Sequence, residues 1–173
     1  MLHSKTLRFI LTALFAALIC VSTLLVQIPI PATGGYANLG DGVILISAFL
    51  LSPAQAILAA GVGSMLADVI TGYMLFAPGT LIIKAGVACI ASLLFRRFAG
   101  KGKGLPVMVF AGLLSECWMV LGYFLYESIL LGVGMAAIGG VGGNIGQGAV
   151  GVVLSSAVTP LLLRSKVLRD LLK

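Results

Sequence analysis

Long apolar runs, broken by short polar stretches, dominate the pattern along the chain. They cover residues 8–28, 42–51, 54–72, 79–95, 105–127 and 143–163, with proline, glycine or charge between them. Five runs approach the roughly 20 apolar residues that a membrane span needs. The run at 42–51 amounts to about 15 Å of helix, so it needs a thinned bilayer, a start within the preceding loop, or shielding by protein.

The composition places these runs in a membrane. The chain has 173 residues, of which 60% are hydrophobic and 9% are charged, and its mean hydropathy is +1.18. A soluble domain carries about 25% charged residues. We therefore expect an all-α integral membrane bundle of six transmembrane helices, forming one domain over residues 1–173. Such a chain has no room for a separate catalytic module.

The basic residues predict the orientation. Ten of the 11 Lys and Arg residues fall into three clusters: Lys5 and Arg8; Arg96, Arg97, Lys101 and Lys103; Arg164, Lys166, Arg169 and Lys173. By the positive-inside rule all three face the cytoplasm, so an even number of spans separates them. This favours a tight cytoplasmic turn at Ser52-Pro53 over one kinked helix across 42–72. Both termini are then cytoplasmic in a multi-pass protein of the cell membrane, and the net charge of +6 does not indicate nucleic acid.

The first run resembles a signal peptide but is longer than the usual apolar region of one and lacks an A-x-A site, which indicates an uncleaved helix. Cys20, Cys89 and Cys117 lie singly in apolar runs and the one histidine is His3, so neither disulfides nor a metal site are expected. We expect no cofactor. The glycines at 100–104 lack the spacing of a nucleotide loop, and no Ser/His/Asp set occurs, so an enzyme is not expected.

Charged residues inside spans are costly and are therefore candidates for function. Asp68 and Lys84 lie near the outer ends of adjacent antiparallel runs and can meet at similar depth. They either form an ion pair that closes the hairpin of helices, or leave Lys84 free to donate to a bound anionic or carbonyl group.

Further polar residues converge at the outer end of the bundle. Glu116, Tyr123 and Glu127 share one helical face, and two amides begin the last run. The expected binding residues are Asn38, Asp41, Asp68, Tyr73, Lys84, Tyr123, Glu127, Asn144 and Gln147, with Glu116 as a floor below them. This set predicts a pocket, open to the outside, for a small flat hydroxylated or nitrogenous solute.

Two other segments suggest movement or association. Residues 28–41 combine two prolines with three glycines, which suits a movable lid over the pocket, or an ordinary loop. Small residues recur at helical spacing in the first and third spans, at Thr12, Ala13, Ala16 and Ala17 and at Ala56, Ala59, Ala60, Gly63 and Ala67. These faces either pack within the chain or dock a partner helix.

Several stretches together resemble a known family: Leu11-Thr12-Ala13-Leu14-Phe15-Ala16-Ala17, Ile28-Pro29-Ile30-Pro31, Gly40-Asp41, the turn at Pro53, Ala67-Asp68-Val69-Ile70-Thr71-Gly72-Tyr73 and Pro78-Gly79-Thr80-Leu81-Ile82-Ile83-Lys84. In this order they resemble the substrate-binding S components of energy-coupling factor (ECF) vitamin transporters, over essentially the whole chain. Within that family they resemble members for hydroxymethylpyrimidine, a thiamine precursor, or pyridoxine.

The resemblance implies a membrane protein that captures a vitamin from outside under a closing lid. It implies docking of small residues in the first helix, here Ala13, Ala16 and Ala17, onto a transmembrane coupling protein driven by two ATPase subunits. One Trp and four Tyr suit a single-ring ligand better than a two-ring or flavin ligand. The alternatives are an S component for riboflavin or another vitamin, a stand-alone permease in which Glu116 carries a proton, and a scaffold that binds no ligand.

Overall fold

The structure is a computed structural model that describes residues 2–99 and 104–164. Within these residues six α-helices form a bundle: α1 (Leu2–Leu25), α2 (Gly40–Leu50), α3 (Pro53–Thr71), α4 (Ala77–Phe98), α5 (Gly104–Leu125) and α6 (Ile138–Arg164). All except α2 are long and apolar enough to cross a membrane. Each of the six predicted runs is therefore helical.

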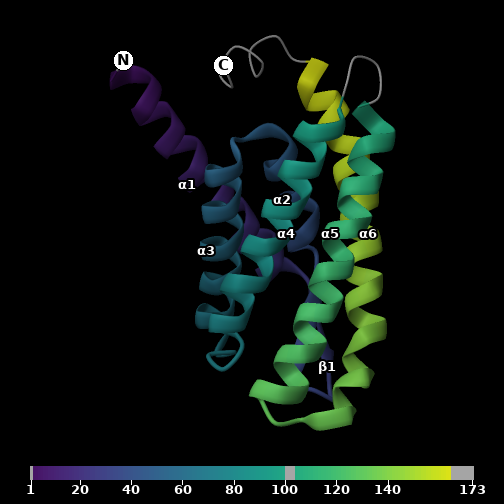
Figure 1. Ribbon diagram of the computed structural model, residues 1–173. Helices are drawn as coiled ribbons and strands as arrows, with labels where there is room; N and C mark the ends of the chain where they lie inside the picture. The colour runs from purple at the N-terminus through teal and green to yellow at the C-terminus, as the bar shows by residue number, and fades with distance from the viewer. Residues whose placement is uncertain (1, 100–103, 165–173) are drawn as a thin grey trace.

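The helices run alternately between two ends of the bundle. Figure 1 shows the start of α1, the end of α4, the start of α5 and the end of α6 at one end of the molecule. The α3–α4 and α5–α6 connections lie at the other end. This arrangement agrees with an even number of helices between the basic clusters. Lys101, Lys103, Lys166, Arg169 and Lys173 lie outside the described residues, so their placement stays a prediction.

The short helix α2 is shielded by protein. Nine of its 11 residues are buried, and it packs mainly on α6 and α4. Ile44 and Leu45 are completely inaccessible. Of the three explanations for its length, shielding accounts for it, because a helix surrounded by other helices presents little surface to lipid.

Helix α2 is tied to α4 at both of its ends. At its first turn Asp41 accepts hydrogen bonds from Lys84 Nζ on both carboxylate oxygens, each at 2.7 Å. Just past its last turn the Leu51 carbonyl accepts a hydrogen bond of 2.6 Å from the Arg96 guanidinium. Since early α2 meets early α4 and late α2 meets late α4, the two helices are parallel.

The chain turns tightly between α2 and α3, as predicted. Pro53 is the first residue of α3, a position where its missing N–H removes no helical hydrogen bond. The Gln55 side-chain oxygen accepts hydrogen bonds from the hydroxyl of Ser52 at 2.7 Å and from its backbone N–H at 3.4 Å. This capping arrangement starts α3 directly after α2 ends.

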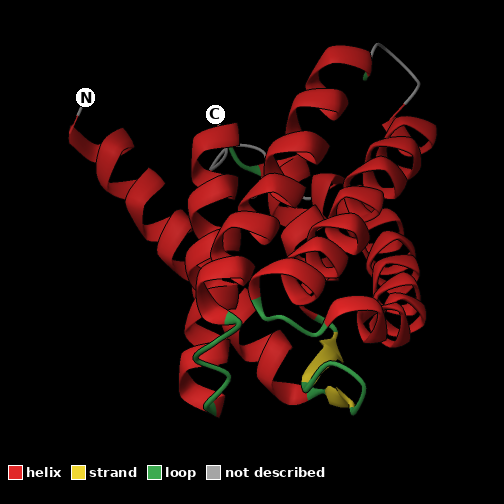
Figure 2. Ribbon diagram, turned by 60° about the horizontal axis from the view of Figure 1, so that its bottom comes forward, coloured by secondary structure: helices red, strands yellow, loops and turns green. Residues whose placement is uncertain are grey.

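The connection between α1 and α2 is a β-hairpin, which corrects the expectation of a loop there, while the bundle itself is all-α. Strand β1 (Gln27–Ile30) pairs antiparallel with β2 (Gly35–Asn38), with Gln27 opposite Asn38, and Figure 2 shows both strands at one end of the bundle. Gly34 adopts a φ of 71° in the turn, which favours glycine. Pro29 is tolerated because each strand of a two-stranded sheet is an edge.

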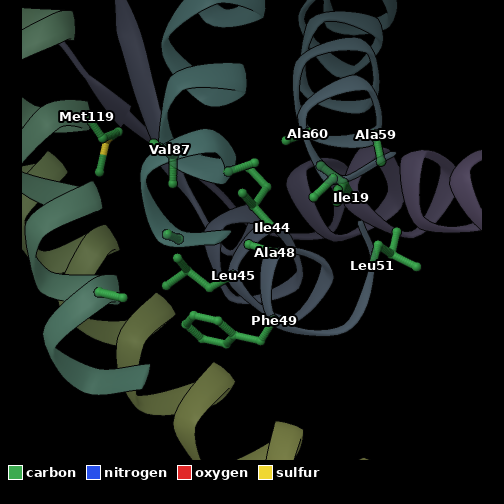
Figure 3. Packing of buried hydrophobic residues seen from close by; sticks show 14 of the residues in the cluster. Ile19, Ile44, Leu45, Ala48, Phe49, Leu51, Ala59, Ala60, Val87 and Met119 are labelled. Carbon is green, nitrogen blue, oxygen red and sulfur yellow. The ribbon is translucent and has the colours of Figure 1, made fainter. Parts of the chain in front are cut away.

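The hydrophobic core surrounds α2. Ile44, Leu45 and Ala48 of α2 meet Ile19 of α1 and Val87 of α4 in one buried cluster, which Figure 3 shows together with Met119 and Phe49. The core is built on the one helix that is too short to span a membrane.

The small residues of α3 pack within the chain. Ala56, Ala59 and Ala67 are fully buried. A Cβ at Gly63 would lie 2.5 Å from the Ala16 carbonyl oxygen of α1, so α1 and α3 touch backbone to backbone there. Of the two alternatives for this face, packing within the chain is the one observed.

Candidate ligand pocket

A narrow polar pocket lies between the hairpin and the helices, and its cavity volume of about 20 Å³ is room for about one water molecule. Strand β2, the residue before α4, and every described helix of the bundle except α2 contribute to its wall. Its lining residues are Thr23, Tyr36, Asn38, Ser64, Asp68, Phe76, Thr80, Lys84, Tyr123, Glu127, Asn144 and Gln147. The pocket therefore collects polar groups from segments far apart in the sequence.

Lys84 is the one cationic residue among the described residues that line the pocket. Its ammonium group makes the ion pair with Asp41 and lies 5.4 Å from the centre of the Tyr123 ring. The amide of Gln147 donates to Asp41 Oδ2, and its oxygen accepts a 2.6 Å hydrogen bond from the Asn38 backbone N–H. Gln147 thus joins the end of β2 to the ion pair.

The ion pair differs from the predicted one. We expected Asp68 to face Lys84, with an ion pair between them as one alternative, but the carboxylate that binds Lys84 is Asp41. The prediction compared only depths along adjacent helices. Because α2 is buried, Asp41 approaches Lys84 from inside the bundle. The ammonium is therefore already bound by a carboxylate and is not free for an anionic ligand.

Asp68 is bound instead by the hairpin. The hydroxyl of Tyr36 on β2 donates to Asp68 Oδ1 at 2.5 Å, and the Tyr36 ring lies 4.6 Å from the Tyr73 ring. Burial raises the pKa of Tyr36, and the hydrogen bond to Asp68 raises it further. The hydroxyl therefore stays protonated and remains a donor at physiological pH, which holds β2 against α3.

Four buried polar atoms in the pocket wall have no hydrogen-bond partner among the described residues. They are Thr23 Oγ1, Ser64 Oγ, Asp68 Oδ2 and Glu127 Oε2. Buried polar groups in native proteins are nearly always bonded, and an unmade bond costs about 1–3 kcal/mol. The pocket is therefore incomplete in chemical terms, and a bound solute with donor groups would satisfy these atoms.

A local change in helix geometry places Glu127. After α5 the chain forms a π-helical turn, η1 (Tyr126–Leu130), and then a 3₁₀ turn, η2 (Gly134–Ala137). π-helical turns are rare and frequently lie at functional sites. A Cβ at Gly140 would lie 3.1 Å from Glu127 Oε2, so this glycine makes room for the carboxylate, which is buried.

The structure brings seven of the ten predicted binding residues to the pocket: Asn38, Asp68, Lys84, Tyr123, Glu127, Asn144 and Gln147. Asp41, Tyr73 and Glu116 do not line it. Asp41 lies behind Lys84, Tyr73 behind Tyr36, and Glu116 beside Gly148 of α6. Glu116 is buried, and both of its carboxylate oxygens lack a partner in the described part of the chain.

Five lining residues were missed from the sequence: Thr23, Tyr36, Ser64, Phe76 and Thr80. Three of them carry a signal in hindsight. Ser64 and Thr80 lie one helical turn before Asp68 and Lys84 and so share their faces. Tyr36 precedes Asn38 by two positions and shares its side of the strand.

The small residues of α1 divide into two groups. Ala16 is half-buried and packs its backbone against Gly63. Ala13 and Ala17, one turn apart, are exposed on the outside of the bundle. Only the second pair is accessible to another helix.

Residues 3–165 match the family model described as ECF-type riboflavin transporter, S component. The chain is 30% identical over 167 residues to the thiamine precursor transporter HmpT of Lactococcus lactis subsp. cremoris, covering 96% of this chain and 93% of that protein. It is also 38% identical over 151 residues to an uncharacterized protein of Pyrococcus woesei, covering 83% and 99%. The protein is thus a multi-pass membrane protein of the ECF-type S-component family, the substrate-binding part of a transporter for a vitamin or vitamin precursor.

Proposed function

We propose that this S component captures a single-ring nitrogen heterocycle from outside the cell, with hydroxymethylpyrimidine as the first candidate and pyridoxine as the second. Both molecules are flat, and both carry hydroxyl or amino groups at their edges. The ring would stack on the pocket tyrosines, and the edge groups would donate to the pocket oxygens.

The observation that carries this proposal is the set of four unpartnered polar atoms beside three aromatic rings. Tyr36, Phe76 and Tyr123 line the same pocket as the unpartnered oxygens of Asp68 and Glu127. Since carboxylates only accept hydrogen bonds, they favour a ligand with several donors. Asn144 adds an amide that can both donate and accept.

The thiamine precursor named for the Lactococcus lactis relative supports hydroxymethylpyrimidine. The family description favours riboflavin as the alternative to a single-ring ligand. A flavin has three fused rings and a ribityl chain, whereas the pocket has room for about one water molecule. Either ligand therefore requires the hairpin to move away from α3, where the Tyr36–Asp68 hydrogen bond holds it. A single ring requires the smaller opening.

The proposal includes topology and partners. All six helices cross the membrane, and α2 does so as a short helix shielded by protein. Both termini lie in the cytoplasm, and the pocket opens to the outside beneath the hairpin. A transmembrane coupling protein and two ATPase subunits drive uptake, as in ECF modules in general. The exposed pair Ala13 and Ala17 provides the surface on α1 to which the coupling protein binds, because small residues allow close helix approach.

The first experiment identifies the ligand. The chain is purified alone in detergent and denatured, and any released molecule is identified by mass spectrometry. Thermal-shift titration with hydroxymethylpyrimidine, pyridoxine and riboflavin follows. We expect stoichiometric hydroxymethylpyrimidine or pyridoxine and a matching stabilisation. Riboflavin alone would contradict the substrate, and no ligand of any kind would contradict binding by this chain.

A second experiment separates an S component from a stand-alone permease. Uptake into liposomes is measured with the chain alone and with the coupling protein and ATPases added. Accumulation should require the full complex and ATP. Counterflow with the chain alone, lost in Glu116→Gln, would instead support a permease.

A further inference from the structure

The inside of the bundle contains far more negative than positive groups. In the described residues there are four carboxylates, Asp41, Asp68, Glu116 and Glu127, and each is at most 5% exposed. Lys84 is the one buried cation in this part of the chain. The other described lysines and arginines are exposed. Any ligand that binds here therefore meets an acidic interior.

The carboxylates are not equally compensated. Asp41 holds the ammonium of Lys84 between both of its oxygens, and Asp68 accepts the Tyr36 hydroxyl. The charge of Lys84 also acts on Asp68. Glu127 has no ion pair, and the one side chain that stabilises its charge is the neutral Thr33 hydroxyl of the hairpin, not a cation. Among the described acids that line the pocket, Glu127 is the one without a positive neighbour.

The position of Glu127 makes it accessible to a ligand in the pocket. It lines the pocket together with Tyr123, which lies one helical turn earlier on α5. Its Oε2 is buried without a partner among the described residues, and it packs closely against Gly140. The carboxylate therefore lies in the pocket wall next to the aromatic ring of Tyr123.

An unpaired carboxylate away from water is costly, at several kcal/mol for a buried ion. A ligand lowers this cost most if it brings a nitrogen that is protonated or that donates a strong hydrogen bond. An anionic vitamin would add a charge of the same sign. A ligand with hydroxyl donors alone would hydrogen-bond Glu127 but leave its charge uncompensated.

We propose that Glu127 is the specificity-determining residue of the pocket and receives a basic ring nitrogen, or an amino group conjugated to it. The inference rests on the proposed function. It restricts the substrates to basic nitrogen heterocycles and excludes carboxylate-bearing vitamins and flavins.

The test combines a ligand change with a protein change. Binding of hydroxymethylpyrimidine is compared by calorimetry, on the purified chain, with that of its benzene isostere, in which C–H replaces both ring nitrogens and methyl replaces the amino group. Wild type should bind the isostere at least ~100-fold more weakly, since a site built for a hydrogen bond rejects an analogue that lacks it. Glu127→Gln should lose most of its affinity for hydroxymethylpyrimidine and bind the isostere as wild type does.

Glu116→Gln is the matched control. Glu116 lies on α5, which leads into η1. It is also buried and lacks a partner among the described residues, but it does not line the pocket. Its replacement should leave both affinities within about threefold, which is less than one ordinary hydrogen bond contributes. Melting temperatures of the ligand-free variants check that each protein is folded.

The outcomes distinguish this inference from the proposed substrate. Equal loss of both ligands in Glu127→Gln, or equal affinity of wild type for both, would overturn the inference and leave an S component for hydroxymethylpyrimidine. Binding of another basic heterocycle with the same dependence on Glu127 would support the inference and overturn only the substrate. Binding of riboflavin or of a carboxylate vitamin alone would overturn both.

Discussion

Two helix contacts in this protein use small residues for opposite purposes. Where α1 meets α3, Gly63 removes a side chain so that the backbone of Ala16 can approach. Along α6 three of the glycines face acidic side chains from other segments. Gly140 lies against Glu127, Gly148 against Glu116 and Gly151 against Asp41.

The difference shows what a small-residue pattern can mean in a membrane helix. At α1–α3 the glycine serves helix association, which in lipid depends on close packing. Along α6 it provides space for carboxylates that would otherwise not fit between helices. Glycine therefore allows close helix packing at the α1–α3 contact and makes room for buried carboxylates along α6.

The largest effect on stability should come from the buried carboxylate Asp41. Asp41→Asn removes the charge that pairs with Lys84 and leaves a buried ammonium, which should lower the free energy of unfolding by about 3–5 kcal/mol. Thermal unfolding in detergent measures this. The double variant Asp41→Asn/Lys84→Met should regain most of the loss, and no recovery would show that the ion pair is not the cause.

A matched pair of alanine substitutions separates scaffold from pocket. Gly63→Ala places a Cβ against fixed backbone and should cost about 2 kcal/mol of stability. Gly140→Ala meets the end of a flexible side chain and should cost less than about 1 kcal/mol, while displacing Glu127 and weakening ligand binding about tenfold. Melting temperature and calorimetric affinity are measured on both variants. Gly63→Ala should mainly lower the melting temperature, and Gly140→Ala should mainly lower the affinity. If both variants lost stability and affinity to the same extent, the distinction between a packing glycine and a pocket glycine would be wrong.

The exposed face of α1 should affect uptake alone. Ala13→Trp places a bulky ring on the surface proposed to dock the coupling protein, so ATP-driven uptake should fall at least ~10-fold. Ligand affinity of the isolated chain should not change. Ala16→Trp, which points toward α3, should instead reduce stability. If Ala13→Trp weakens ligand binding as much as uptake, the docking assignment is wrong.

The smallest effect should come from a glycine that serves neither purpose. A Cβ at Gly146 would meet nothing within 4 Å. Gly146→Ala should therefore raise stability by up to ~1 kcal/mol through helix propensity, with no change in affinity or uptake. A loss of stability would indicate that the flexibility of α6 matters to the fold.

Much of the fold could be predicted because each apolar run has a period and a length. The turn at Ser52-Pro53 followed from the parity of the basic clusters, and the face shared by Tyr123 and Glu127 followed from helical spacing. The hairpin was missed because its strands are four residues each and contain proline, which weakens any strand signal.

Other features depend on three-dimensional packing that no local pattern contains. The sequence prediction paired Lys84 with Asp68, and the observed partner is Asp41 because α2 lies at the centre of the bundle. The pairing of Tyr36 with Asp68 joins residues 32 apart. The π-helical turn that positions Glu127 has no marker in its sequence.

The parallel pairing of α2 with α4 has a consequence for biogenesis. Lys84 is synthesised 43 residues after its partner Asp41, and Arg96 is synthesised 45 residues after its partner Leu51. Until then α2 is too short to span and carries a charge that costs about 2.5–3.5 kcal/mol to insert. We therefore expect the first three helices to remain at the insertion machinery until α4 is synthesised, and the earliest stable intermediate in lipid to contain four helices.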